Sequence, residues 1–496
     1  MATHGLTIAA AKTVTNNGTW TEPTGGTLTC AGSATFAGIL GMNFYIFSAT
    51  VASSVIIFQD GKTYKVLNNL TLTGTDENEI HLRTAAGAQA ILSNTGGAQA
   101  VTYVKVEDVE ATALHPITAS DSWDINRGQA GALTHWVFDP MLFTYQTSGN
   151  WDVAANWFEG VLPAVTDNII VSAGVNLALN GPRTINNVEV TGTITVATDD
   201  FTVNGILDNN GTMTISSGTV DVEGAYDATG GTNTFTAGGH LELAGAVTSL
   251  GTLTAADHGT VTYNGAGAQN IPAGGNPQTY VNLVVGGGGG IKSLQGGVIC
   301  SGALTVENLV TLAMGAHTLT VAGASTITGT LDVAGSTLTL TGASVVGGTI
   351  TVDDGTVDAN GTFTAAGGNV TFTGDGDLLL SGVVASLGTL TGSTHGTVTY
   401  DGAGAQNIPA GADPQTYVNL IVGGAADQTK TLLGDVIVSG DFTIDASVTT
   451  AMGTKNLTVA GATDINGTVT ISSGTLDANG AFDAAGAGNA TGGIIT

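Results

Sequence analysis

The stretch Ser249–Gly287 reads SLGTLTAADHGTVTYNGAGAQNIPAGGNPQTYVNLVVGG, and it returns as Ser386–Gly424, SLGTLTGSTHGTVTYDGAGAQNIPAGADPQTYVNLIVGG. The two copies are identical at 32 of 39 positions, and the offset from Ser249 to Ser386 holds without a gap along the whole stretch. Such a copy is the signature of a chain built by repetition. The repeat therefore indicates the architecture more directly than any single motif does.

A shorter period lies inside the large one. Gly192-Thr-Ile-Thr recurs as Gly211-Thr-Met-Thr, and Gly329-Thr-Leu-Asp recurs at the same spacing as Gly348-Thr-Ile-Thr. Between these marks, apolar and small polar residues alternate in short runs, which is the pattern of short β-strands. Glycine-containing pairs end the runs, as tight turns require.

These periods predict an all-β chain that folds as a parallel β-helix, or β-solenoid, with rungs of about 19 residues and a superrepeat of about 137 residues. A single rung cannot bury its apolar side chains, whereas stacked rungs share one continuous core. A propeller or a sandwich is the alternative, but neither is typical of so regular a register. Threonines are expected to face outward, and the expected inward residues include Leu319, Val321, Leu338, Leu340, Ile350 and Val352.

Composition and charge exclude several classes of partner. Only 10% of the 496 residues are charged, and the net charge is −29. Binding of nucleic acid needs a basic footprint, so we expect no nucleic-acid partner. No apolar run reaches the roughly 18 residues of a membrane span. Cys30 and Cys300 lie far apart in the sequence, and we expect two buried free thiols rather than a disulfide.

The pattern divides the chain into three segments. Residues 1–143 form an irregular β or β-helix segment, residues 144–171 form a Trp-rich element, and residues 172–496 form the repeat solenoid. The large units of this solenoid span about 211–347 and 348–485. Uncapped solenoid ends expose strand edges.

The Trp-rich element is the expected cap. Two aromatic rings can cover the end of a stacked core, and proline suits a turn better than a ladder. We therefore expect Trp151, Trp157 and Pro163 to serve in end capping or assembly.

Several motifs resemble the β-helical passenger and adhesin regions of large secreted bacterial surface proteins. Terminal coils of those regions are similar to a series of segments in residues 1–143, namely Val55–Val66, Leu70–Thr75, Glu79–Arg83, Val101–Val109 and His135–Phe138. The start of a new β-helix there is similar to the pattern formed by Trp151, Trp157, Gly160, Pro163, Asp167 and Val171. The resemblance implies a location outside the cell or on its surface.

We expect a non-enzymatic extracellular structural protein, a rod-like subunit of a surface fibre or of an adhesin stalk that stacks end to end. The expected partners are further copies of the chain, with a surface glycan or a cell-surface receptor. One alternative is a β-helical polysaccharide-active enzyme, although basic residues are too few and too scattered for its groove. Another is an ice-binding solenoid, although the Thr-x-Thr pairs are unevenly spaced.

Calcium is the only cofactor that the sequence suggests. Gly374–Asp377 resembles half of a calcium-binding turn through Asp375 and Asp377, and Asp353 with Asp354 forms a second acidic turn. Ca²⁺ needs roughly six to eight oxygen ligands, and one such turn supplies too few. We favour solvated acidic turns over a metal site.

The remaining motifs have ordinary interpretations. His258 and His395 occupy equivalent positions and are expected to be turn histidines. The run Gly286–Gly290 lacks the pattern of a phosphate-binding loop. The mixed-charge cluster of Asp76–Glu79 with His81 and Arg83 could hold an acid and a base, but we interpret it as a coil turn. No catalytic residue is predicted.

Overall fold

The computed structural model shows an all-β parallel β-solenoid of about 23 turns, each roughly 20 residues long. It describes residues 5–21, 23–75, 78–126, 132–138, 141–254, 258–275, 277–392, 394–411, 414–485, 487–490 and 493–496, and for 487–490 only the backbone. In this part of the chain the only helical element is the 3₁₀ turn η1 (Ala154–Asn156). Two compact units are present, Met1–Ile170 with Ile185–Asn187, and Val171–Thr184 with Val188–Thr496.

In the first unit, two parallel ladders form the walls. The first runs through β1 (Leu6–Ala9), β3 (Thr27–Ala31), β5 (Asn43–Ala49), β7 (Thr63–Thr73), β9 (Ala90–Asn94) and β12 (Val109–Glu110). The second runs through β2 (Lys12–Asn16), β4 (Ala34–Gly38), β6 (Val55–Phe58), β8 (Ile80–Thr84), β11 (Val104–Glu107) and β14 (Trp123–Asp124).

The turns of this unit are irregular in length. Strand β7 is long enough to pair twice, with β9 through its first residues and with β10 (Ala98–Thr102) through its last. Strand β13 (Ile117–Ala119) pairs with β15 (Trp136–Phe138). Lys105 pairs with Trp123, so this turn is short. Asn69 pairs with Ala98, and the turn between these two residues is much longer.

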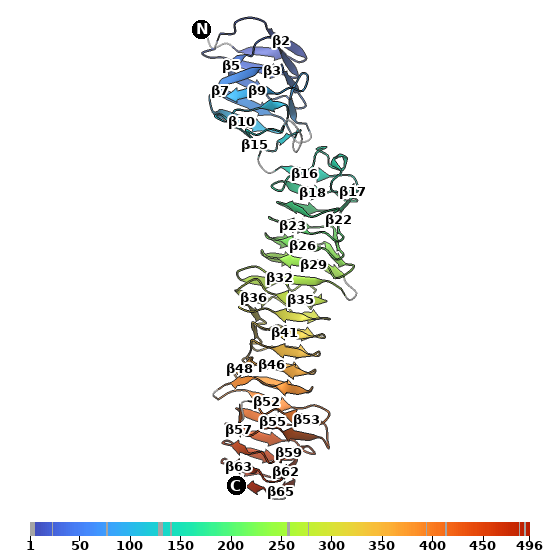
Figure 1. Ribbon diagram of the computed structural model, residues 1–496, viewed down its shortest axis with the longest axis vertical. Helices are drawn as coiled ribbons and strands as arrows, with labels where there is room; N and C mark the ends of the chain where they lie inside the picture. The colour runs from blue at the N-terminus through green and yellow to red at the C-terminus, as the bar shows by residue number, and fades with distance from the viewer. Residues whose placement is uncertain are drawn as a thin grey trace. The chain divides into compact units, whose positions relative to one another are not determined.

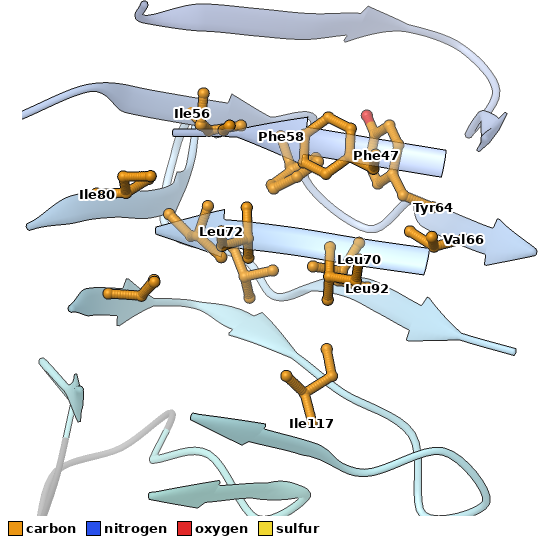
Figure 2. Packing of buried hydrophobic residues seen from close by; sticks show 14 of the residues in the cluster. Phe47, Ile56, Phe58, Tyr64, Val66, Leu70, Leu72, Ile80, Leu92 and Ile117 are labelled. Atoms are coloured by element: carbon orange, nitrogen blue, oxygen red, sulfur yellow. The ribbon is translucent and has the colours of Figure 1, made fainter. Parts of the chain in front are cut away.

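An aromatic cluster fills the core of the first unit. Phe36, Phe44, Phe47, Phe58 and Tyr64 are buried, and the centroids of neighbouring rings lie 4.7–6.4 Å apart. Figure 2 shows the rings of Phe47, Phe58 and Tyr64 above aliphatic side chains that include Leu70 and Leu92. Aromatic pairs at such distances contribute about 0.5–1.5 kcal/mol each beyond the burial of their area.

In the second unit, three short strands make one turn, and equivalent strands of successive turns pair in parallel. Figure 1 shows these turns stacked from β22 (Thr193–Val196) to β65 (Ala487–Ala490). The longest ladders are one from β20 (Arg183–Ile185) to β50 (Val384–Ser386), called ladder H here, and one from β34 (Gln278–Tyr280) to β64 (Phe482–Asp483), called ladder J. Strands that pair in sequence order differ by three in their numbers, which defines the three-strand turn.

Alternation along the strands decides which side chains face inward, as the sequence predicts. Leu319, Val321, Leu338, Leu340, Ile350 and Val352 are all fully buried. The threonines between them, such as Thr320 and Thr339, are half-buried on the outer surface. Both cysteines are free and buried, as predicted. Burial raises the pKa of the Cys30 thiol and of the Cys300 thiol to about 12.

The rung is more variable in length than the sequence period predicts. The partner of Ile194 is Met213, which keeps the short Gly-Thr period, whereas the partner of Gln406 is Lys430, several positions further on. Short rungs coincide with tight Gly-Thr turns, and long ones contain the loops of the copied stretch. The mean rung is therefore slightly longer than the sequence period.

The superrepeat does not contain a whole number of turns. Strand β32 (Thr260–Tyr263) of the first copy is equivalent to β52 (Thr397–Tyr400) of the second, twenty strands later. Twenty strands make six turns and two strands of a seventh, so β32 lies in ladder H and β52 in ladder J. Equivalent residues of the two copies therefore lie on different faces of the solenoid.

The copied stretch is also where ladders are interrupted. The two ladders that contain β30 (Val247–Ser249) and β31 (Thr252–Thr254) end there, while ladder H continues through β32. In the second copy, ladder H ends at β50 and ladder J continues through β52. In each copy, one unbroken ladder keeps the stack continuous. The loops of the copied stretch lie on the other two faces, where the ladders end.

Candidate functional sites

A buried lysine occupies the loop of each copied stretch. Lys292, in β36 (Ile291–Leu294), is fully buried. Its Nζ donates hydrogen bonds to the carbonyl oxygens of Gly265 and Gly267, the second at 2.7 Å. Burial lowers the pKa of the Lys292 ammonium. The lysine thus fills a loop whose backbone carbonyls would otherwise lie buried without donors.

The second copy repeats this arrangement. Lys430, in β56 (Thr429–Leu432), donates to the carbonyl oxygens of Gly402 at 2.7 Å and Gly404 at 2.9 Å, and to Oε1 of Gln406 at 2.6 Å. Burial lowers the pKa of Lys430, and the nearby carboxylate of Asp401 opposes that shift. A charged donor held by several acceptors is the arrangement that buried charge requires.

A buried glutamine pins the same loop to the preceding turn. Nε2 of Gln269 donates to the carbonyl oxygens of Leu243 at 2.8 Å and Gly245 at 2.7 Å, and its Oε1 accepts from the Gly265 amide at 2.9 Å. Gln406 makes the equivalent three contacts in the second copy. The retained Gly-Ala-Gly-Ala-Gln sequence therefore encodes a loop locked from inside.

A pair of tyrosines completes this interior polar network. The hydroxyls of Tyr263 and Tyr280 lie 3.1 Å apart, as do those of Tyr400 and Tyr417. All four side chains are buried, and burial raises the pKa of each hydroxyl. Each hydroxyl satisfies the other in a core that offers few polar partners.

The tight turn before the second tyrosine depends on glycine. Gly274 and Gly411 have φ of +51° and +54°, and a Cβ on either would overlap Oε1 of the following glutamine, Gln278 or Gln415. The identity of the two copies thus reflects packing of polar groups in the core.

Sequence reasoning missed the lysine although a signal was present. In Ile291-Lys-Ser-Leu294 and Thr429-Lys-Thr-Leu432, alternation places the lysine in register with an inward leucine. Ile291 is correspondingly 52% exposed. An inward lysine next to a glycine-rich loop is the pattern that would have revealed the contact.

The predicted calcium ligands lie on adjacent turns of the second unit. The turn with Asp353 and Asp354 precedes β46 (Thr356–Ala359), and Asp375 precedes β49 (Asp377–Leu380). Oδ1 of Asp354 accepts from the amide of Asp375 at 3.1 Å, and Oδ1 of Asp375 lies 2.9 Å from Nδ1 of His395. Burial raises the pKa of Asp377.

These acidic turns are neighbours, but they do not form a set of metal ligands. Among the described residues, no group of three or more His, Cys, Asp or Glu side chains is placed to hold a metal ion. The side chain of Asp375 is 87% exposed. Calcium binding at these turns stays a prediction.

The two predicted cap tryptophans pack together in the first unit. Trp151 and Trp157 are buried with centroids 5.0 Å apart, and Nε1 of Trp157 donates to the carbonyl oxygen of Trp151 at 2.9 Å. The ring of Tyr145 lies 4.8 Å from that of Trp157. Pro163 is half-buried in the loop before β18 (Asn168–Val171). A capping role for these residues stays a prediction.

The two repeated histidines have different surroundings. His258 lines a cavity of about 70 Å³ with Phe235 and Tyr280. The equivalent cavity of the second copy, about 30 Å³, is lined by Phe372 and Tyr417, and His395 contacts Asp375. The positions agree with turn histidines. The five glycines Gly286–Gly290 lie between β35 (Asn282–Val285) and β36 and form a turn.

The mixed-charge cluster lies on the outer face of β8 and β11. Nε2 of His81 is 3.0 Å from Oε2 of Glu107, and burial lowers the pKa of His81 although Glu107 opposes the shift. Nζ of Lys105 is 3.9 Å from Oε2 of Glu79. Arg83 pairs in register with Glu107. Asp76 and Glu77 of the predicted cluster lie outside the described residues.

Comparison with protein-family models, with curated protein sequences and with solved structures gives no match. Within the described residues, no helix has both the length and the apolar character needed to cross a bilayer.

Proposed function

We propose that this chain is an extracellular structural protein, a rod-like subunit of a surface fibre or adhesin stalk. The observation that carries the proposal is the continuous stack of three-strand turns in the second unit, in which at least one ladder always joins a turn to the next. Such a stack resists bending because each rung shares its hydrogen bonds and its core with the next. The surface location follows from the resemblance of residues 1–143 to passenger coils.

The interior network supports a mechanical role. The lysine, glutamine and tyrosine side chains of each copy connect successive turns through buried hydrogen bonds, for example from Gln269 to Leu243 and Gly245. These bonds act where two of the three ladders are interrupted. They therefore reinforce the places at which a rod of this design would bend first.

Excision of one superrepeat tests the proposal. A variant in which Thr248 is joined directly to Ser386 loses residues 249–385 and restores an equivalent junction. At about 4.8 Å per turn, the second unit shortens by about 32 Å. Electron microscopy or small-angle scattering should measure that difference against the full chain, with a single cooperative unfolding transition in both. An unchanged maximum dimension, or a second unit that appears as separate globules, contradicts the rod.

Self-association of such rods is the second part of the proposal. Any parallel ladder ends in a strand with unpaired backbone groups, to which another strand can add. Sedimentation velocity over a range of protein concentrations, with and without calcium, should show end-to-end oligomers. Rods that stay single under all these conditions would contradict the proposal of a fibre subunit, whereas the proposal of a stalk would stand.

A further inference from the structure

In the first unit, one corner of the solenoid recurs on successive turns. Tyr103 lies between β10 and β11, and Asp121 lies between β13 and β14. The amide of Tyr103 donates to the carbonyl oxygen of Ser120 at 3.1 Å, and the amide of Ile80 donates to that of Tyr103 at 3.0 Å. These bonds stack the corners, so that Glu79, Tyr103 and Asp121 follow one another along the unit.

Two of these corners hold strained backbone. Tyr103 has φ of 52° and Asp121 has φ of 47°, in the left-handed region. This conformation is unfavourable for a bulky residue, and glycine would adopt it at no such cost. Ser53, at the equivalent corner before β6, has φ of 59°, so this conformation is a feature of the corner and does not by itself indicate a ligand.

The corner residues line a cavity of about 120 Å³ together with Trp123, Met141 and Leu142. Glu79 is only 8% exposed, and the Lys105 ammonium is 3.9 Å from its carboxylate. The cavity thus presents acceptor oxygens and two aromatic side chains.

Trp123 supplies an independent indication of a ligand. It is 4% exposed, and its indole N–H has no acceptor among the described residues. The comparable N–H groups of Trp136 and Trp157 donate to carbonyl oxygens at 2.8 and 2.9 Å. A buried donor without a partner costs about 1–3 kcal/mol. An acceptor from outside the chain would remove this cost.

We propose that this corner cavity binds the hydroxyl-bearing edge of a neutral sugar. A sugar hydroxyl both accepts and donates, so one group can accept from the indole N–H of Trp123 and donate to the carboxylate of Glu79 or Asp121. The half-buried ring of Tyr103 provides the apolar surface that a pyranose face needs, and Trp123, which is only 4% exposed, contributes its indole N–H. An ammonium group or a metal cation would pair with the carboxylates but leave the indole N–H unsatisfied. Anionic sugars are repelled by the two carboxylates.

The test uses the full chain and a panel of methyl glycosides of glucose, galactose, mannose and N-acetylglucosamine, with binding measured by saturation-transfer NMR and calorimetry. At least one neutral glycoside should bind. The variant Trp123→Phe removes the N–H and keeps a ring, so it should weaken binding about tenfold while leaving the thermal midpoint unchanged or higher. Glu79→Gln should also weaken binding.

Trp136→Phe is the matched control. Its N–H already has a partner, the carbonyl oxygen of Val109, so this variant should lower the thermal midpoint and leave sugar affinity unchanged. The proposal is overturned if no glycoside binds, if affinity is equal in the parent and Trp123→Phe, or if tetramethylammonium or Ca²⁺ binds at the cavity in place of the sugars. These outcomes leave the rod proposal untouched, because that rests on the second unit.

Discussion

Nζ of Lys430 lies 2.6 Å from Oε1 of Gln406, and both side chains are buried inside a turn of the solenoid. Lys430 also donates to two backbone carbonyls, and no carboxylate of the described residues is in salt-bridge contact with it. The lysine therefore holds the loop through neutral acceptors. One side chain thus donates to two carbonyl oxygens of the loop.

Replacing Lys430 by methionine should therefore destabilise the second unit. Methionine keeps the apolar stem, but the carbonyl oxygens of Gly402 and Gly404 lose their donor. We expect the free energy of unfolding to fall by about 1–3 kcal/mol, measured by denaturant titration. Lys455→Met, at a half-exposed position, is the control and should change it by less than about 0.5 kcal/mol. An equal loss of unfolding free energy in both variants would show that the buried hydrogen bonds of Lys430 do not stabilise the fold.

The tyrosine pair should show strong non-additivity. Tyr280→Phe removes one hydroxyl and leaves the buried hydroxyl of Tyr263 without its partner, 3.1 Å away in the parent. We expect each single variant to lose about 1–2 kcal/mol and the double variant with both phenylalanines to lose less than the sum. A double-mutant cycle by chemical denaturation measures the coupling. Purely additive values would mean that the hydroxyls do not interact.

Alkaline pH should unfold the chain in a step linked to tyrosine ionisation. Burial raises the pKa of seven tyrosines, namely Tyr64, Tyr145, Tyr226, Tyr263, Tyr280, Tyr400 and Tyr417. Because the folded state keeps these protons above about pH 10 while the unfolded chain releases them, stability is full below that pH and falls as pH rises further.

The lysines act in the opposite direction. Burial lowers the pKa of Lys292 and Lys430, so the unfolded chain binds more protons just below the ordinary lysine pKa, and stability rises slightly there. With seven tyrosines against two lysines, the net change above the ordinary lysine pKa is a loss. Tyrosinate absorbance should emerge together with the loss of circular dichroism. Ionisation of all tyrosines before unfolding would contradict the burial.

The two thiols should be unreactive in the folded chain. The pKa of Cys30 and of Cys300 is raised to about 12 by burial, so almost no thiolate exists near pH 8. A thiol-reactive dye should label neither cysteine at that pH in buffer and both in denaturant. Rapid labelling of one cysteine in buffer would indicate that its part of the solenoid opens.

Much of the fold could be predicted because the period-2 alternation alone decides burial in a solenoid. Leu319 and Val321 follow this alternation, and so do the buried lysines Lys292 and Lys430, which were not predicted. The offset between copies could not be predicted, because all three faces carry the same strand pattern and no residue marks which face a strand will join. The corner formed by Tyr103 and Asp121 was missed for a related reason, since these residues lie a full turn apart in the sequence and meet only through stacking.

The unequal division of the superrepeat has a consequence for how such a chain presents itself. Loops of nearly identical sequence in successive copies point in different directions around the axis, as β32 and β52 do on ladders H and J. A partner that recognises such a loop would find it available from more than one side, which favours multivalent attachment. Because the three walls accept the same strands, a chain with one copy more or one copy fewer would keep its strand register, and only the number of stacked turns would change.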